Sequence, residues 1–252
     1  MEWQESNGVR WLEAQLDGAG AAFSTRLGGV SEGPFDSLNL GLITADAPEA
    51  VAENRRRLGG ALGFEPEQVA FARQVHGTRL IEHTPPFARS FRLPSNEKEQ
   101  TNGLPEADGH VVREPGLAAL VFTADCLPVA VAGPGGMAML HAGWRGLAGG
   151  ILAAGVDAVE ATSAAIGPGI GPCCYEVGEE VLDAFSDLGG EVAEGRMLDL
   201  AEVARLQLLR AGVERVESAG LCTRCEGELF FSHRRDAGVT GRQGGIGWVE
   251  AG

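Results

Sequence analysis

The chain has 252 residues, and its 35 acidic against 20 basic side chains give a formal net charge of −15 at pH 7. Proteins that bind nucleic acid or a membrane surface need a cationic face, so this balance argues against both kinds of partner. Hydrophobic residues make up 44% of the chain and charged residues 22%, as in an ordinary globular protein. No apolar run approaches the roughly 18 residues that span a bilayer, and the N-terminus lacks the pattern of a signal peptide, so we expect a cytoplasmic protein.

The pattern of apolar residues predicts an α+β fold with mixed β-sheets, in which short strands alternate with a few helices. Strands are expected at residues 69–75, 78–83, 109–114, 117–123, 128–132, 137–141, 219–222, 229–233 and 246–250. Helices are expected at residues 47–62, 147–161, 177–188 and 199–211. Because nothing in the composition marks a boundary, residues 1–252 are interpreted as a single domain.

Helix caps and one long loop are also visible in the sequence. Asp46 and Glu49 have the spacing of an N-cap and N3 pair for the first helix, and Asp199 and Glu202 have it for the last. Residues 85–107 are polar, punctuated by proline and aperiodic, which is typical of a long mobile loop.

Three potential metal ligands follow apolar, strand-like runs beside turn-forming residues: His76 in RQVHG, Cys126 in TADCLP and His141 in MLHAGW. Two imidazoles and a thiolate are good zinc ligands, and three protein ligands leave a fourth tetrahedral position open, as in a catalytic zinc site. A zinc ion lowers the pKa of a water in that position toward about 7. From the residues alone, two other interpretations stay open. The side chains could be separately buried or hydrogen-bonded, or Cys126 could be a nucleophile with His141 as its base, without a metal.

Three further segments are candidates for binding an anionic or planar ligand. Gly28 and Gly29 follow Arg26, and a Gly-Gly turn lets backbone N–H groups approach an anion that an arginine can grip with two hydrogen bonds. Arg145 lies beside the start of a predicted helix, whose terminal N–H groups favour anions. Tyr175, the only tyrosine, is a candidate to stack on a base or to hydrogen-bond it. The alternative for each is a plain structural role as a turn, a surface charge or a packing residue.

The other four cysteines form two close pairs. Cys173 and Cys174 are adjacent, and Cys222 and Cys225 are separated by two residues. In principle the four sulfurs could form a structural zinc site. Adjacent cysteines are poorly placed to bind one ion, so we do not expect that site to form. With five cysteines in all, free thiols, metal ligands or a nucleophile are favoured over a disulfide framework.

Together these segments resemble the YfiH/laccase-domain family, also described as multicopper polyphenol oxidase-like proteins or peptidoglycan editing factors. The motifs that carry the resemblance span nearly the whole chain in order: TRLGGVSEGPFDSLNLG, RQVHG, EADGHV, FTADCLPV, HAGWRG, IGPGIGPCCYEVG, CTRCEGELFFSHRRD and TGR. The resemblance implies a layered α/β/β/α domain in which His76, Cys126 and His141 bind a catalytic zinc. His233 stands where the family more often has tyrosine, and the tail GGIGWV is unusually rich in glycine.

The resemblance also implies an activity, namely phosphorolysis of adenosine, inosine, guanosine and methylthioadenosine, with deamination of adenosine. The partners would then be a purine nucleoside and phosphate, with Arg26 and Arg145 holding the phosphate. Asp125 would move protons or, alternatively, orient a histidine ligand. Two other functions stay open. One is a copper-dependent polyphenol oxidase, against which the total of five histidines argues. The other is a metal-free Cys–His hydrolase or peptidoglycan-precursor editor with Cys126 as nucleophile.

Overall fold

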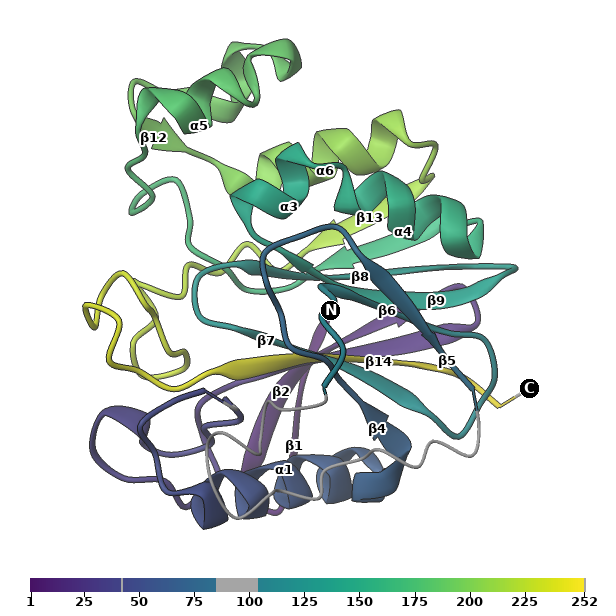
Figure 1. Ribbon diagram of the computed structural model, residues 1–252, viewed down its shortest axis with the longest axis vertical. Coiled ribbons are helices and arrows are strands. Elements are labelled where there is room, and N and C mark those ends of the chain that lie inside the picture. The colour runs from purple at the N-terminus through teal and green to yellow at the C-terminus, as the bar shows by residue number, and fades with distance from the viewer. Residues whose placement is uncertain (42, 85–103, 252) are drawn as a thin grey trace.

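A computed structural model describes residues 1–41, 43–84 and 104–251 of the chain. Two six-stranded sheets lie face to face, and helices cover the outer face of each sheet (Figure 1). This α/β/β/α layering with mixed sheets confirms the predicted fold class. Most of the loop predicted at 85–107 lies outside the described residues.

The first sheet joins the N-terminal strands to the last strand of the chain. Its order is β1 (Glu2–Ser6), β2 (Val9–Leu16), β3 (Ala19–Ser24), β14 (Gln243–Val249), β7 (Ala118–Thr123) and β4 (Val69–Ala70). The second sheet has the order β13 (Arg215–Ser218), β10 (Ser163–Ile166), β8 (Leu127–Gly133), β9 (Gly136–Ala142), β6 (Gly109–Val112) and β5 (Leu80–His83). A small ladder joins β11 (Ala193–Glu194) to β12 (Met197–Leu198). The helices are α1 (Pro48–Leu62), α3 (Trp144–Ala148), α4 (Ile151–Val159), α5 (Glu179–Asp183) and α6 (Leu200–Arg210).

Apolar side chains fill the spaces between all four layers. Helix α1 buries Leu58 against the first sheet, and α4 and α6 cover the second. Between the sheets, Met137 and Met139 of β9 occupy the space left by Gly247 and Gly245 of β14, where added Cβ atoms would collide with the methionine side chains. The glycine-rich tail therefore has a packing reason. Within the described residues, the helices are too short or too polar to cross a bilayer.

Two predicted helices differ from the observed ones. The helix expected at 147–161 is divided into α3 and α4, because Gly150 adopts a left-handed conformation with φ +88°. The helix expected at 177–188 is reduced to α5 and a short 3-10 turn. Phe185 leaves the helical region with φ −122° and ψ 12°, and its ring is only 1% exposed, so burial of the ring overrides the helical pattern there.

The cap predictions have different outcomes. Asp199 caps α6 by accepting a hydrogen bond from the N–H of Glu202 at 3.0 Å, as predicted. Asp46 does not cap α1, whose N-cap is Ala47. Its carboxylate instead accepts hydrogen bonds from the side chains of Ser31 and Asn39.

Most predicted strands are present, as β4 to β9 and β14; β4 to β7 are shorter than predicted, and β8, β9 and β14 are longer. The strand expected at 219–222 is wrong, since β13 ends at Ser218 and Gly220 turns the chain with φ +62°. The strand expected at 229–233 is also wrong, because this segment buries its two phenylalanines within a loop. No strand was predicted at the positions of β1 to β3 or of β10 to β13, and the small residues of β10 give no strong apolar signal.

Candidate functional site

Three side chains converge where strands of the second sheet end. Cys126 directly precedes β8 and His141 lies near the end of β9, two strands whose register pairs Pro128 with His141. His76 reaches the same place from the loop between β4 and β5. The ligand-type atoms of this His–Cys–His trio all lie within 4.8 Å of one another. The residues predicted as metal ligands are thus brought together, at separations compatible with one shared ion.

Asp108, directly before β6, organises two members of the trio. Its carboxylate accepts hydrogen bonds from the backbone N–H groups of Val75, His76 and Gly77 at 3.1, 2.9 and 2.8 Å. It also lies 2.8 Å from Nδ1 of His141 and is fully buried. Because a carboxylate only accepts, Nδ1 carries the hydrogen and the other ring nitrogen, Nε2, is left for a ligand or a metal. No role was predicted for Asp108, although the motif EADGHV contains it.

The trio is strongly polarised. Burial by itself raises the pKa of the Cys126 thiol, but the charge of His141 and the hydrogen bonds from both histidines lower that pKa to about 6. Burial by itself lowers the pKa of His141, but Cys126 and Asp108 raise it to about 9. Burial also raises the pKa of Asp108, yet the hydrogen bonds from His141 and Gly77 keep it below its ordinary value. Without a metal, the site therefore holds a thiolate beside an imidazolium at neutral pH.

The backbone around the trio is strained and tightly fitted. His76 and Asp125 have φ values of +59° and +89°, a region that costs non-glycine residues about 1–3 kcal/mol each. A Cβ atom at Gly143 would lie 2.9 Å from Sγ of Cys126 and 3.2 Å from the ring of His76. Only glycine at this position lets the chain after β9 pass so close to the trio.

Asp125 was predicted to move protons or to orient a histidine. Its carboxylate accepts hydrogen bonds from the hydroxyl of Thr223 and the N–H of Arg234, both at 2.7 Å. The residue thus ties the loop after β13 to the strand end that carries Cys126. The carboxylate that contacts and orients His141 is that of Asp108 instead.

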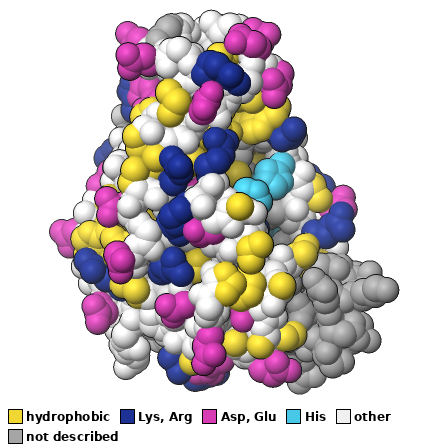
Figure 2. Space-filling model, turned by 90° about the vertical axis from the view of Figure 1, so that its left-hand side faces the viewer, with side chains coloured by type: hydrophobic (Ala, Val, Ile, Leu, Met, Phe, Trp, Pro, Cys, Tyr) yellow, Lys and Arg dark blue, Asp and Glu magenta, His cyan; other side chains and the backbone are white. Residues whose placement is uncertain are grey.

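The trio lies at the wall of a cavity of about 570 Å³, a size typical of small-molecule sites. Aromatic rings of Phe122, Trp144 and Tyr175 line it, together with Asp125. Burial first, and then the charge of Cys126, raise the pKa of Tyr175 to about 12, so its phenol stays protonated. Figure 2 shows this side of the molecule, where histidine side chains reach the surface beside basic ones.

The cations that line the cavity differ from those predicted. Arg73, Arg234 and Arg242 line it, together with His233. Arg242 contacts the carbonyls of Thr240 and Gly241 through Nη1, and burial lowers its pKa while Cys126 and Asp125 act to raise it. The motif TGR contains Arg242, but nothing in the sequence showed that this arginine, rather than another, would line the cavity.

The other predicted substrate-binding residues, apart from Tyr175, are not among those that line this cavity. The guanidinium of Arg26 donates to the carbonyls of Asp36 and Gly227 at 2.6 and 3.1 Å. Gly28 and Gly29 pack against neighbouring backbone, where a side chain would collide. Arg145 is exposed and stacks on Trp144, 4.2 Å from the ring centroid. Of the predicted substrate-binding residues, Tyr175 alone is among those that line the cavity.

Comparison with known proteins places the chain in a family. Residues 20–250 match the family described as multi-copper polyphenol oxidoreductase laccase. A Geobacillus stearothermophilus protein named purine nucleoside phosphorylase YlmD is 39% identical over 263 residues, which cover 95% of this chain and 93% of that protein. An Escherichia coli K12 protein named purine nucleoside phosphorylase YfiH is 38% identical over 249 residues, with coverages of 93% and 96%.

Solved structures agree with these sequence matches. The crystal structure of the Bacillus licheniformis hypothetical protein YfiH has a TM-score of 0.84 and 32% identity, covering 98% of this chain and 99% of that one. The crystal structure of YlmD from Geobacillus stearothermophilus has a TM-score of 0.83 and 36% identity, with coverages of 98% for both. The resemblance predicted from the motifs is confirmed, and the chain belongs to the YfiH-containing family of multi-copper polyphenol oxidoreductase laccases.

Proposed function

We propose that this chain is a zinc-dependent purine nucleoside phosphorylase. The observation that carries the proposal is the match of more than nine-tenths of the chain to relatives of that name, at 38–39% identity. The cavity supports it, since an aromatic-lined space with cations and a potential metal site suits a nucleoside and phosphate.

The donor set of the trio fits zinc. His76, Cys126 and His141 would hold the ion, and a bound zinc supplies Lewis acidity at the one coordination position that the protein leaves free. Asp108 supports this role by fixing the hydrogen of His141 on Nδ1.

The phosphate is assigned to Arg234 and Arg242, because both line the cavity whereas Arg26 and Arg145 do not. The aromatic side chains, Tyr175 among them, provide faces on which a purine can stack. This assignment replaces the expectation that Arg26 and Arg145 grip the anion.

In phosphorolysis, a phosphate oxygen forms a bond to C1′ of the ribose while the bond from C1′ to the purine nitrogen breaks. Positive charge develops on the ribose, and the phosphate held by Arg234 and Arg242 stabilises it. The purine leaves with the bonding electron pair and needs a hydrogen-bond donor or a proton. The protonated phenol of Tyr175 is suited to be that donor.

Deamination of adenosine is the second activity that we propose for this cavity. Water replaces the amino group at C6, which gives inosine and ammonia, with Asp125, the carboxylate among the described residues that line the cavity, for proton movement. The test is to incubate metal-quantified protein with adenosine, with and without phosphate, and to separate the products by chromatography. We expect adenine only with phosphate and inosine under both conditions. No conversion in either incubation would overturn the assignment.

Two alternatives have specific support. The family description and the His–Cys–His donor set favour a copper oxidase. However, Nε2 of His83 and Nδ1 of His110 form a hydrogen bond of 2.9 Å in the protein interior. These two histidines are therefore not available as ligands of a second copper centre. The polarised Cys126–His141 pair favours a metal-free hydrolase. Oxidation of phenols after copper loading would support the first. Activity that survives chelation but not alkylation of Cys126 would support the second.

A further inference from the structure

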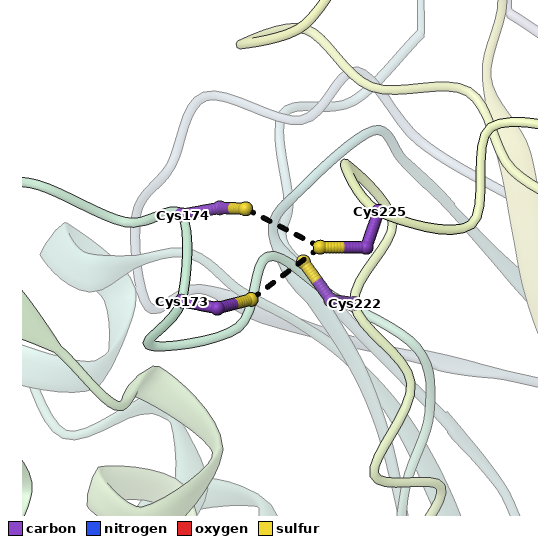
Figure 3. Close-up of side chains that lie close together, drawn as sticks. All are labelled: Cys173, Cys174, Cys222 and Cys225. Atoms are coloured by element: carbon purple, nitrogen blue, oxygen red, sulfur yellow. Dashed lines mark hydrogen bonds between the residues drawn. The ribbon is translucent and has the colours of Figure 1, made fainter.

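A second group of potential metal ligands, four cysteines, lies between two turns, apart from the trio. Cys173 and Cys174 lie in the turn after β10, and Cys222 and Cys225 lie in the turn after β13. Figure 3 shows the four side chains pointing into one small space. All four Sγ atoms lie within 4.8 Å of one another, and Sγ of Cys225 is 3.5 Å from those of Cys173 and Cys174. We call this set the four-cysteine cluster.

These separations suit four thiolates around one ion. Zn–S bonds of about 2.3 Å in a tetrahedron place neighbouring sulfurs about 3.8 Å apart. Two of the observed sulfur–sulfur separations are 3.5 Å and none exceeds 4.8 Å, so they are compatible with that value. All four residues are free cysteines, whereas a disulfide needs sulfurs about 2.05 Å apart. An iron–sulfur cluster inserts several atoms between its thiolates and needs a wider space.

The adjacent pair can share one ion because the backbone turns between them. The N–H groups of Cys174 and Tyr175 both donate to the carbonyl of Gly171 at 3.0 Å, which makes a helix-like turn. Successive side chains on such a turn are rotated by about 100°, whereas on a strand they point to opposite faces. Gly171 also leaves room, since a Cβ there would lie 3.2 Å from Cβ of Cys222. The four sulfurs lie together, although adjacent cysteines were expected to be poorly placed around one ion.

We propose that the four-cysteine cluster binds a structural Zn²⁺ ion. Four protein thiolates fill the tetrahedron and leave no open position, which is the arrangement of a structural rather than a catalytic site. Four thiolates around a divalent ion carry excess negative charge, and two neighbouring groups offset it. The N–H of Gly171 donates to Sγ of Cys222 at 3.2 Å, and the positive charge of Arg224 acts on Cys174.

The ion would join two segments that form part of the cavity wall. Tyr175 directly follows Cys174 and lines the cavity. Thr223 lies within the second turn and donates its hydroxyl to Asp125 at 2.7 Å, and Asp125 lines the cavity as well. The two turns are far apart in sequence, so a metal link between them restricts the unfolded chain. The four-cysteine cluster thus cross-links the two turns and stabilises this part of the cavity wall.

Zinc content tests the proposal directly. The double variant Cys173→Ser, Cys225→Ser removes two ligands at exposed positions, where the substitution disturbs no core packing. Glu226→Gln, next to the cluster, keeps all four sulfurs and serves as the control. Each protein is made with zinc supplied, purified under reducing conditions and analysed by elemental mass spectrometry. We expect the double variant to hold about one zinc fewer per chain than the wild type, and the control to match the wild type.

A second measurement identifies the ligands. In the variant Cys126→Ser, His141→Ala, the trio is removed and the four-cysteine cluster is intact. X-ray absorption at the zinc edge should show only sulfur neighbours, at about 2.3 Å. Equal zinc in the wild type and in the double cysteine variant would overturn the proposal. Nitrogen or oxygen neighbours around the remaining zinc, or disulfides in the reduced protein, would overturn it too. These outcomes do not depend on whether nucleosides are substrates.

Discussion

Substitution of Asp108 by asparagine tests the organisation of the trio most sharply. The carboxylate accepts three backbone N–H groups and faces Nδ1 of His141, with two of these contacts on each oxygen. An asparagine amide replaces one oxygen by an NH₂ group, so two donors lose their acceptor in either orientation. Each unsatisfied buried donor costs about 1–3 kcal/mol, and the loss of stability is therefore about 2–6 kcal/mol. Because the loop of His76 is partly exposed, we expect the lower half of that range.

Urea unfolding at pH 7 measures this loss, and zinc titration of the folded variant should show affinity weakened by about 10- to 100-fold. The matched control is Asp187→Asn, whose carboxylate is 72% exposed and pairs with Arg210 on the surface, so its cost is below about 1 kcal/mol. The pKa of Asp108 is lowered on folding, so its contribution is present above the ordinary value of 3.8 and disappears as the pH falls through the folded value. A variant as stable as the control, with unchanged zinc affinity, would refute the role of Asp108.

Three further predictions concern the trio and the cavity. Gly143→Ala should weaken zinc binding at least tenfold, because its Cβ collides with the trio, whereas Gly60→Ala meets nothing within 4 Å and should leave zinc binding unchanged; equal affinities in a zinc titration would contradict the fit. The pKa of His141 is about 9 without metal, so zinc must displace its proton, and affinity should rise about tenfold from pH 7 to pH 8. Calorimetry in buffers of different ionisation enthalpy should report about one proton released at pH 7.5, and no release would refute the imidazolium. Arg242→Ala should lower the apparent affinity for phosphate at least tenfold in steady-state kinetics, and Arg26→Ala should not; the opposite order would restore the assignment made from the sequence.

The sequence predicted what depends on local pattern. The apolar runs of β7 and β8 are nearly continuous because both strands are buried between other layers, and their ends carry polar residues. That combination identified Cys126 as a candidate, and the apolar run of β9 that ends at His141 identified the histidine. His76 follows the apolar run at residues 69–75 and was a candidate for the same reason, although it comes from a loop with a left-handed backbone.

The remaining features depend on tertiary contacts that leave no periodic signal. Asp108 is one of 35 acidic residues, and its function appears only when β6 lies beside β9 and the loop of His76. Arg26 and Arg242 both lie within two residues of a glycine, yet Arg26 binds backbone carbonyls and does not line the cavity, whereas Arg242 lines it. The convergence of the adjacent pair Cys173–Cys174 was not predicted, because its turn geometry depends on Gly171.

The most direct test of the central claim compares product formation by metal-loaded and metal-free protein. Zinc-loaded wild type is incubated with adenosine and phosphate, beside chelated protein and the His141→Ala variant. We predict that the loaded wild type forms ribose 1-phosphate in an amount equal to the free bases, adenine and hypoxanthine together, and that these products fall sharply in the other two samples. Equal product formation after complete removal of the metal, or no ribose 1-phosphate from the loaded protein, would contradict a zinc-dependent phosphorylase.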